Sequence, residues 1–279
     1  MDLNLNKELD SRYWPSKAWF LLSKLRDLKP VIQCITNFVS MDLMANTVIS
    51  AGASPAMIHC IEEIPDFIHN VHALCINIGT ISPDWLPAMI LAAEMAITLG
   101  KPWILDPVAA GVSKFRLNAC LELVEKKPTV IRGNASEIIS LSEASAGTAL
   151  GVDSSHESTE AIKAAKGLAR SCGAVVVVSG ATDIVTDGHH VIGSENGAAM
   201  MQKITATGCA VTALIAAFLA VDPMHALDAA ASAMSVFGIA GEMGMEKASG
   251  PASLRVHLID CLYGLDQAAI LSRARIKRL

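Results

Sequence analysis

The sequence predicts a three-layer α/β domain with a mostly parallel central sheet, and three observations support this prediction. Strand-like apolar runs alternate with helical patterns from Val31 onward, and the connections between them are short. Hydrophobic residues make up 52% of the 279 residues and aromatic residues only 4%. This composition is typical of a parallel sheet that is buried on both faces. No linker or internal repeat interrupts the pattern, so we expect a single domain over residues 1–279.

The first half of the chain is predicted to contain five strands, each followed by a helix. Ser40 is a candidate N-cap for the first of these helices, and Gly52 lies just past its end. Ser82 and Pro83 begin the third helix and Gly100 ends it, because Ser caps helices and Pro fits their first turn. The strands are expected at 31–36, 56–59, 73–78, 103–105 and 130–131, and the helices at 41–50, 62–71, 83–99, 116–125 and 135–141.

The clearest strand of the chain is Ala174–Ser179, a run of apolar residues with high β-propensity that follows a helix expected at 159–170. Two shorter strands, 184–186 and 191–193, flank Asp187-Gly188, a pair that is typical of a hairpin turn. The sheet is therefore expected to end in an antiparallel hairpin.

From Cys209 to the end of the chain the pattern is mainly helical. The basic stretch 273–278 is interpreted as a frayed, solvated helix end. The segment 142–155 is small and polar, and we expect it to form a surface loop.

Composition and charge exclude several classes of function. The formal net charge is −5 and the cationic residues are scattered, so no nucleic-acid-binding surface is expected. The longest apolar run, Ala210–Val221, is shorter than the roughly 18–20 residues of a membrane span, so no membrane association is expected. The first 17 residues lack the apolar core of a signal peptide. The chain has seven cysteines and no CxxC pair, which favours a reducing, cytoplasmic location.

Polar residues that follow predicted strands are the first candidates for a ligand site. In open parallel sheets, ligands bind beyond the carboxyl ends of the strands, where these residues meet. They are Thr36, Asn37, Gly79, Thr80, Asp106, Arg132, Asn134, Ser179 and Gly180.

The segment 205–209, Thr-Ala-Thr-Gly-Cys, precedes an apolar helix and is a candidate phosphate site. Small residues let the backbone approach a ligand closely, and the free N–H groups of a helix's first turn favour anions. The alternative is an ordinary helix start. Neither a GxxxxGK[ST] phosphate loop nor a GxGxxG dinucleotide fingerprint is present.

The segment 132–137, Arg-Gly-Asn-Ala-Ser-Glu, has two compatible interpretations. In the functional one, Arg132 binds nucleotide phosphates and Glu137 binds Mg²⁺, directly or through water. In the structural one, Asn134 is a helix N-cap and Glu137 completes a capping box.

Three more candidates each keep a structural alternative. Asp106 precedes a proline and is either a turn former or a carboxylate for metal or phosphate binding. The hydroxyl of Ser179 either binds ligand or caps a strand end. Met57 either forms the floor of an apolar pocket or belongs to the core. The eight histidines have no metal-ligand spacing, so no metal other than Mg²⁺ is expected.

Taken together, these motifs resemble those of the hydroxyethylthiazole kinases, which belong to the ribokinase-like superfamily. The resemblance extends in order from about residue 30 to residue 265, and IRGNASEI with TGC is its most specific part. The matching stretches are CITN (34–37), Ala45-Asn46, GASPAM (52–57), NIGT (77–80), LDPV (105–108), IRGNASEI (131–138), 174–180, TDG (186–188) and TGC (207–209).

The resemblance implies a ribokinase-like fold and a kinase of thiamine salvage. It implies ATP as co-substrate, Mg²⁺ as cofactor and 5-(2-hydroxyethyl)-4-methylthiazole as acceptor. It also implies a homotrimer with active sites between subunits, which agrees with the apolar composition. By position, the resemblance implies that ATP is bound by Arg132, Ser179 and Asn134, and the thiazole by Met57, Ala206 and Asn37. It implies that Mg²⁺ and the phosphates are bound by Asp106 and Glu137. The catalytic residues that it implies are Gly208, Cys209 and Asp106.

Departures from the family pattern are few. Cys209 stands where most of the superfamily has an Asp base, and we expect the helix start to favour its thiolate. The family usually has Gly where Ala206 stands, and a second Gly is common where this chain has Ala252. The alternatives are a kinase of another small alcohol, such as a hydroxymethylpyrimidine, and a ligand-binding module of the same fold without turnover.

Overall fold

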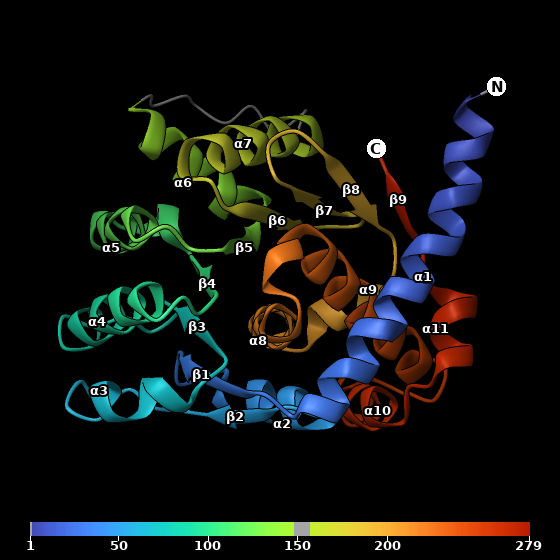
Figure 1. Ribbon diagram of the computed structural model, residues 1–279, viewed down its shortest axis with the longest axis horizontal. Coiled ribbons are helices and arrows are strands. Elements are labelled where there is room, and N and C mark those ends of the chain that lie inside the picture. The colour runs from blue at the N-terminus through green and yellow to red at the C-terminus, as the bar shows by residue number, and fades with distance from the viewer. Residues whose placement is uncertain (1, 148–156) are drawn as a thin grey trace.

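The structure is a computed structural model that describes residues 2–147 and 157–279, and within them one sheet of nine strands forms the central layer (Figure 1). The strand order is β2-β1-β3-β4-β5-β6-β7-β8-β9. Pairings from β2 to β6 are parallel and those from β6 to β9 are antiparallel. The strands are β1 (Val31–Ile35), β2 (Ser54–Ala56), β3 (Ala73–Asn77), β4 (Trp103–Asp106), β5 (Val130–Asn134), β6 (Val175–Ser179), β7 (Asp183–Thr186), β8 (Val191–Ser194) and β9 (Ile276–Arg278).

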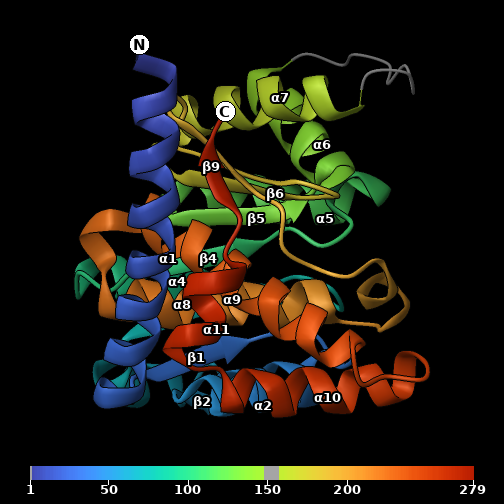
Figure 2. The ribbon, with the colours of Figure 1, turned by 90° about the vertical axis from the view of Figure 1, so that its right-hand side faces the viewer.

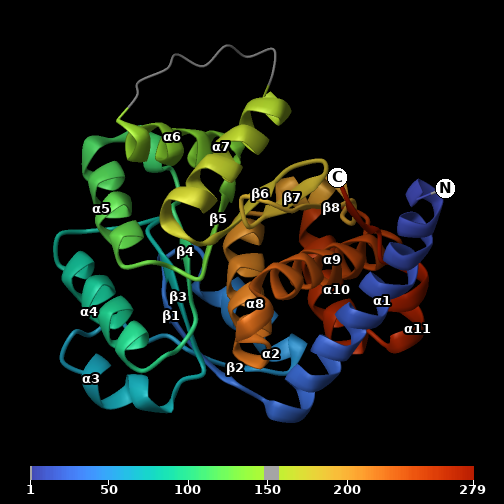
Figure 3. The ribbon, with the colours of Figure 1, turned by 45° about the horizontal axis from the view of Figure 1, so that its top comes forward.

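Helices cover both faces of the sheet, so the predicted three-layer α/β fold is confirmed (Figure 3). One layer holds α3 (Ile64–Phe67), α4 (Trp85–Thr98), α5 (Lys114–Glu125), α6 (Ala135–Ala146) and α7 (Glu157–Cys172). The other holds α1 (Asp2–Leu28), α2 (Met41–Ala51), α8 (Thr207–Val221), α9 (Ala226–Met245), α10 (Pro251–Gly264) and α11 (Gln267–Arg273). Short 3₁₀ turns occupy η1 (Ile68–Asn70), η2 (Ala110–Val112), η3 (Ala199–Lys203) and η4 (Pro223–His225).

Successive strand residues alternate between two hydrophobic cores, one on each face of the sheet. In β1, Cys34 packs with α1, α2 and α8, whereas Ile35 packs with the α3–α7 layer. Because both faces are covered, the strands are apolar throughout, as the sequence pattern predicts.

Helix α8 is the central helix of its layer. Nearly all of its residues from Ala210 to Leu219 are buried, and a helix that is hydrophobic on every side must lie within a core. This accounts for the longest apolar run of the sequence. Among the described helices, none combines the length and hydropathy required to span a membrane.

The N-terminal segment forms a long helix, α1, that packs across the α8–α11 side of the molecule (Figure 2). Trp14, Ala18, Leu21 and Leu25 are buried at intervals of three or four residues along one face. The segment that lies outside the family resemblance therefore contributes to the core.

The C-terminal prediction was wrong. Residues Ile276–Arg278 form strand β9, which pairs antiparallel with β8, rather than a frayed helix end. Helix α11 ends at Arg273, and the edge of β8 offers unpaired backbone groups that the last residues satisfy. Ile276 faces the core while Lys277 and Arg278 are exposed, and charged residues are typical of a strand at the edge of a sheet.

Two local predictions are also corrected. The second strand is Ser54–Ala56 rather than 56–59, because it pairs in register with Val31–Gln33 of β1. Helix α6 continues to Ala146, so the first part of the expected loop 142–155 is helical, and residues 148–155 of it lie outside the described residues. Other predicted elements differ from the observed ones only in their end residues.

Two predicted caps also differ. Ser40 makes no side-chain cap to α2, because its hydroxyl bonds to Thr36 and to the Asn37 carbonyl. Ser82 precedes α4 by a full turn; its hydroxyl accepts from the N–H of Trp85, the first helical residue, at 3.3 Å.

Candidate active site

The carboxyl ends of the parallel strands meet the N-terminus of α8. Asn37 follows β1, Asp106 ends β4, Arg132 lies in β5 and Ser179 ends β6. This is the edge of the sheet where the sequence predicts a ligand site.

A chain of hydrogen bonds links three of these strands to α8. The Asn37 amide donates to Asn77 Oδ1 at 2.7 Å, and the Asn77 amide donates to Asp106 Oδ2 at 2.7 Å. Thr212, one turn into α8, donates its hydroxyl to the same carboxylate oxygen at 2.8 Å. All four side chains are buried, so the network fixes the site rigidly.

Asp106 retains one acceptor without a partner. Its Oδ1 is buried and accepts no hydrogen bond from the described residues. Burial raises the pKa of Asp106 to about 6, and the charge of Arg132 and bonds from Thr212 and Asn77 partly oppose this rise. A buried, unsatisfied carboxylate oxygen costs stability and indicates a group kept for binding or catalysis.

Arg132 lies directly against the start of α8. A Cβ built at Gly208 would come within 2.6 Å of Arg132 Nη1, so only glycine allows this approach. The Arg132 side chain is buried, and its Nε finds no acceptor in the described part of the chain. The guanidinium and the first N–H groups of α8 thus form one positive region suited to phosphate.

A cavity of about 530 Å³ extends from this positive region. Its lining includes the start of α8 and polar residues at the ends of β5 and β6, namely Thr207, Gly208, Arg132, Asn134 and Ser179. The remaining lining is Gly180, Ala181, Asp183, Asn196, Gly197, Ala198, Ala199, Met201, Gln202, Val211, Met234, Phe237 and Gly238, most of which are small or apolar. The residues expected to bind ATP and phosphate therefore share one cavity.

Asp183 is a further buried carboxyl group in this cavity, and it is absent from the residues expected at the site. Its Oδ1 accepts from the Gly180 N–H at 3.0 Å. Burial raises the pKa of Asp183 to about 6, against the opposing effects of this bond and of Arg132. Asn77 and Thr212 were likewise not expected, although Asn77 ends a strand and could have been found by its position.

Cys209 is not among the residues that line the cavity. The Asn37 amide contacts its sulfur at 3.5 Å. Burial and the negative charge of Asp106 raise the pKa of Cys209, although Asn37, Asn77 and Arg132 act in the opposite direction. The expectation that the helix start favours a thiolate is therefore wrong, because desolvation outweighs the helix end.

Glu137 forms the predicted capping box with Asn134. Asn134 Oδ1 accepts from the Glu137 N–H at 2.9 Å, and Glu137 Oε2 accepts from the Asn134 N–H at 2.8 Å. The other carboxylate oxygen accepts from the Ala109 N–H at 2.8 Å, which joins the loop after β4 to the start of α6. The structural interpretation holds, and each oxygen retains a lone pair for a ligand.

The donor set fits Mg²⁺ in a particular way. No cluster of three or more metal-ligating side chains occurs among residues 2–147 and 157–279. Mg²⁺ commonly binds through one or two carboxylates and keeps its other positions for water and substrate phosphates. The orphan oxygen of Asp106 and the fixed carboxylate of Glu137 suit that mode.

Ala206 has a left-handed backbone at the N-cap of α8, with φ 66° and ψ 9°. This conformation is strained for a residue with a Cβ and free of strain for glycine. The geometry therefore favours glycine over alanine at this position.

Met57, Asn37 and Ala206, expected on the acceptor side, line no part of the 530 Å³ cavity. Met57 is half-buried and packs against the α1–α2–α8 core. Next to Asn37, Phe38 is 69% exposed and lies 4.8 Å from the Trp85 ring, and Val39 is also exposed. Two exposed apolar side chains thus follow Asn37 directly in the chain.

The chain is similar to proteins of one kinase family. The profile of the hydroxyethylthiazole kinase family matches residues 22–268. A hydroxyethylthiazole kinase of Arabidopsis thaliana is 62% identical over 99% of this chain and 100% of its own length. One of Zea mays is 57% identical over 97% of this chain and 96% of its own. A solved structure of a hydroxyethylthiazole kinase from Pyrococcus horikoshii OT3 has a TM-score of 0.88 at 38% identity, over 94% of this chain and 98% of that one.

Proposed function

The chain belongs to the hydroxyethylthiazole kinase family, and we propose that it transfers the γ-phosphoryl group of ATP to the hydroxyethyl group of 5-(2-hydroxyethyl)-4-methylthiazole, in thiamine salvage. The observation that carries this proposal is the close approach of Arg132 to the start of α8 in the lining of one cavity, with the charge of Arg132 also acting on the buried carboxylate of Asp106.

ATP occupies the 530 Å³ cavity with its phosphates at Arg132 and the start of α8. Arg132 contacts phosphate oxygens through its guanidinium, and Ser179 and Asn134 contribute further polar atoms to the lining. The base packs against apolar residues of the lining such as Phe237. This orientation directs the γ-phosphate toward Gly208 and Cys209.

The transfer is direct and in line, without a covalent intermediate. The backbone N–H groups of Gly208 and Cys209 stabilise the equatorial oxygens of the transferring group, where negative charge accumulates. The alcohol approaches from the side of Asn37 and Met57. Because phosphoryl transfer is loose, the alcohol loses its proton late, and a neutral Cys209 thiol is compatible with the reaction.

Asp106 and Glu137 are the residues that would hold Mg²⁺. When bound, the ion neutralises charge on the phosphates. Asn77 and Thr212 orient the Asp106 carboxylate, and the two backbone N–H groups at Glu137 orient the second one.

We also propose that the active unit is a homotrimer and that it works in the cytoplasm. The exposed Phe38 and Val39 flank Asn37, so a neighbouring subunit that covers them would complete the acceptor side. The cytoplasm suits a chain in which Cys34 and Cys75 face each other on adjacent strands as free thiols.

A coupled ADP-release assay across small alcohols tests the function. We expect turnover with the thiazole alcohol and at least about tenfold lower kcat/KM with hydroxymethylpyrimidine, because the acceptor site must bind one ring in register. Preference for another alcohol would identify a different kinase of the same fold, and no ADP release with any acceptor would identify a binding module.

Arg132→Ala in the same assay tests the nucleotide site. The KM for ATP should rise about 10- to 100-fold, since hydrogen bonds to a charged group are lost, and the KM for the thiazole should rise less. An equal change in the two KM values would show that Arg132 does not belong to the nucleotide site.

A further inference from the structure

One wall of the cavity, residues 196–202, is not part of the sheet or of a long helix. It consists of an extended stretch and the 3₁₀ turn η3, and six of its residues line the cavity. Such a segment has no ladder of backbone hydrogen bonds to define its position, so other contacts must do so.

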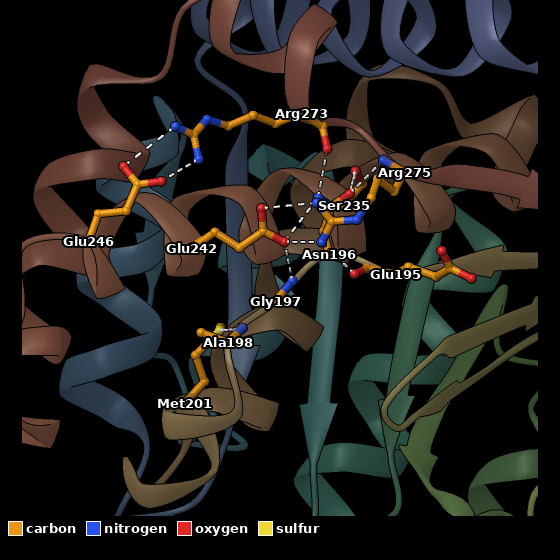
Figure 4. A network of polar contacts seen from close by, with 10 residues as sticks. All are labelled: Glu195, Asn196, Gly197, Ala198, Met201, Ser235, Glu242, Glu246, Arg273 and Arg275. Atoms are coloured by element: carbon orange, nitrogen blue, oxygen red, sulfur yellow. Dashed lines mark hydrogen bonds and ion pairs between the residues drawn. The ribbon is translucent and has the colours of Figure 1, made fainter.

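The wall is anchored on helix α9, at Gly238 and Glu242 (Figure 4). A Cβ built at Gly238 would lie 2.5 Å from the Asn196 carbonyl oxygen, so the backbone of the wall rests directly on the helix. One turn later, Glu242 Oε1 accepts from the Gly197 N–H at 2.8 Å and from the Asn196 amide at 3.2 Å.

The Asn196 side chain lines the cavity but has no bonding capacity left for a ligand. Its amide donates to Glu242 and to the Arg273 carbonyl at 2.9 Å. Its Oδ1 accepts from the Ser235 hydroxyl at 2.7 Å and from the Arg275 N–H at 2.8 Å. The side chain therefore ties the wall to α9 and to the C-terminal segment.

Arg275 supplies the positive charge that pairs with the Glu242 carboxylate. Its guanidinium pairs with both oxygens of Glu242 and also donates to the Glu195 carbonyl at 2.7 Å. The Glu242 side chain is only 15% exposed, so the ion pair fixes the carboxylate that holds the wall.

We propose that Glu242 is a positioning residue for nucleotide binding, which keeps wall 196–202 in the arrangement that the nucleotide requires, with Arg275 as its partner. The inference rests on the proposed function, because it takes the cavity to be the ATP site. A wall that is free to move away lowers the fraction of molecules competent to bind and so weakens the apparent affinity. Binding of the acceptor should not change, because the residues expected to bind it, Asn37, Met57 and Ala206, do not line this cavity.

Glu242→Ala removes the acceptor for Gly197 and Asn196, and Glu242→Gln restores an acceptor without the charge. We expect Glu242→Ala to raise the KM for ATP about tenfold, the effect of losing hydrogen bonds that hold the wall. The KM for the thiazole alcohol should change less than about twofold, and Glu242→Gln should recover most of the affinity for ATP.

Glu246→Ala is the matched control. Glu246 is the C-cap residue of the same helix and pairs with Arg273 of the same C-terminal segment, at 2.7 Å; among the described residues it makes no side-chain hydrogen bond or ion pair with the wall. Its loss should leave both KM values unchanged. An unchanged KM for ATP in a folded Glu242→Ala chain would overturn the proposal, as would an equal rise in Glu246→Ala or an equal rise for both substrates.

Two further measurements keep the test decisive. If Glu242→Ala does not fold, Arg275→Ala removes the partner at an exposed position, and an unchanged KM for ATP in that variant would contradict the proposal.

Calorimetric binding of a non-hydrolysable ATP analogue separates this inference from the function. If the parent chain binds the analogue without phosphorylating the thiazole, only the assigned reaction fails, and Kd values for the analogue then decide the role of Glu242. If it does not bind the analogue, both fail.

Discussion

Asp183 illustrates, at the scale of single residues, how a binding site costs stability. Its carboxyl group is buried in the cavity, and its pKa of about 6 lies above the ordinary value of 3.8. A raised carboxyl pKa means that its stabilising effect is fully present below pH 3.8 and is lost as the pH rises through about 6. From the size of the shift, the ionised group costs about 3 kcal/mol at neutral pH.

Asp183→Asn should therefore raise the free energy of unfolding at pH 7.5, and the melting temperature by about 5 °C, because the buried charge is removed and the Gly180 N–H keeps an acceptor. The difference from the parent should shrink as the pH falls from 6 toward 3.8. Thermal unfolding followed by circular dichroism at several pH values measures it. A lower melting temperature at pH 7.5 would show that the carboxylate is paired rather than merely buried.

For Cys209 the question is whether its side-chain sulfur takes part in the reaction. Since burial and Asp106 raise the pKa of this thiol, it is neutral at pH 7, and its backbone N–H is the group that acts. General-base catalysis contributes roughly 10²–10⁴-fold. We expect Cys209→Ala to lower kcat by less than about 10²-fold, with both KM values nearly unchanged.

Cys209→Asp is the companion variant and should retain substantial activity, because a carboxylate is ionised at neutral pH and can accept the alcohol's proton. Steady-state kinetics on the two folded variants decides between side chain and backbone. If kcat of Cys209→Ala falls by about 10⁴-fold, the upper end of the range for general-base catalysis, the sulfur does act as a base. An inactive, folded Cys209→Asp would show that residue 209 does not lie beside the attacking alcohol.

Helix α8 is the element that defines the site, and the residue at its N-cap is strained. Ala206 is held in the left-handed region at the N-cap, which costs about 1 kcal/mol for a residue with a Cβ. Ala206→Gly should therefore raise the melting temperature by about 2–4 °C. Differential scanning calorimetry checks this. A decrease would indicate that the Ala206 methyl group makes packing contacts worth more than the strain.

The elements that sequence could predict are those whose local pattern agrees with the fold. Helix α2 with Gly52, strand β6 and the hairpin at Asp187-Gly188 have strong periodicity or turn chemistry, and the structure has them where expected. Strand β9 could not be predicted, because Ile276–Arg278 becomes a strand only through pairing with β8, more than 80 residues earlier in the chain.

Part of the site could also be predicted, because the local sequence pattern places its residues at strand ends and at a helix start. Arg132, Asn134, Ser179 and Gly208 follow strands or begin a helix, so topology alone brings them to one cavity. Thr212 and Asp183 gave no such signal, because their role depends on tertiary contacts with Asp106 and Arg132. The raised pKa of Cys209 was missed because it results from burial, which no local pattern reveals.

At the scale of the whole molecule, the open apolar surface at Phe38 and Val39 predicts assembly. Monomeric proteins seldom expose such side chains beside a functional site unless a partner covers them. Light scattering at micromolar concentration should give the mass of a trimer, and Phe38→Asp should lower that mass and raise the KM for the thiazole. A monomer mass for the parent chain would contradict the proposal that a neighbouring subunit completes the acceptor side.

The central claim is transfer of the γ-phosphoryl group from ATP to the oxygen of the thiazole alcohol. It is tested by mass spectrometry of the product formed from ATP that carries ¹⁸O at the non-bridging γ-oxygens. The account predicts a thiazole phosphate ester that retains every labelled oxygen and whose bridging oxygen is the unlabelled one of the alcohol. Labelled inorganic phosphate with no ester, or no reaction at all, would contradict it.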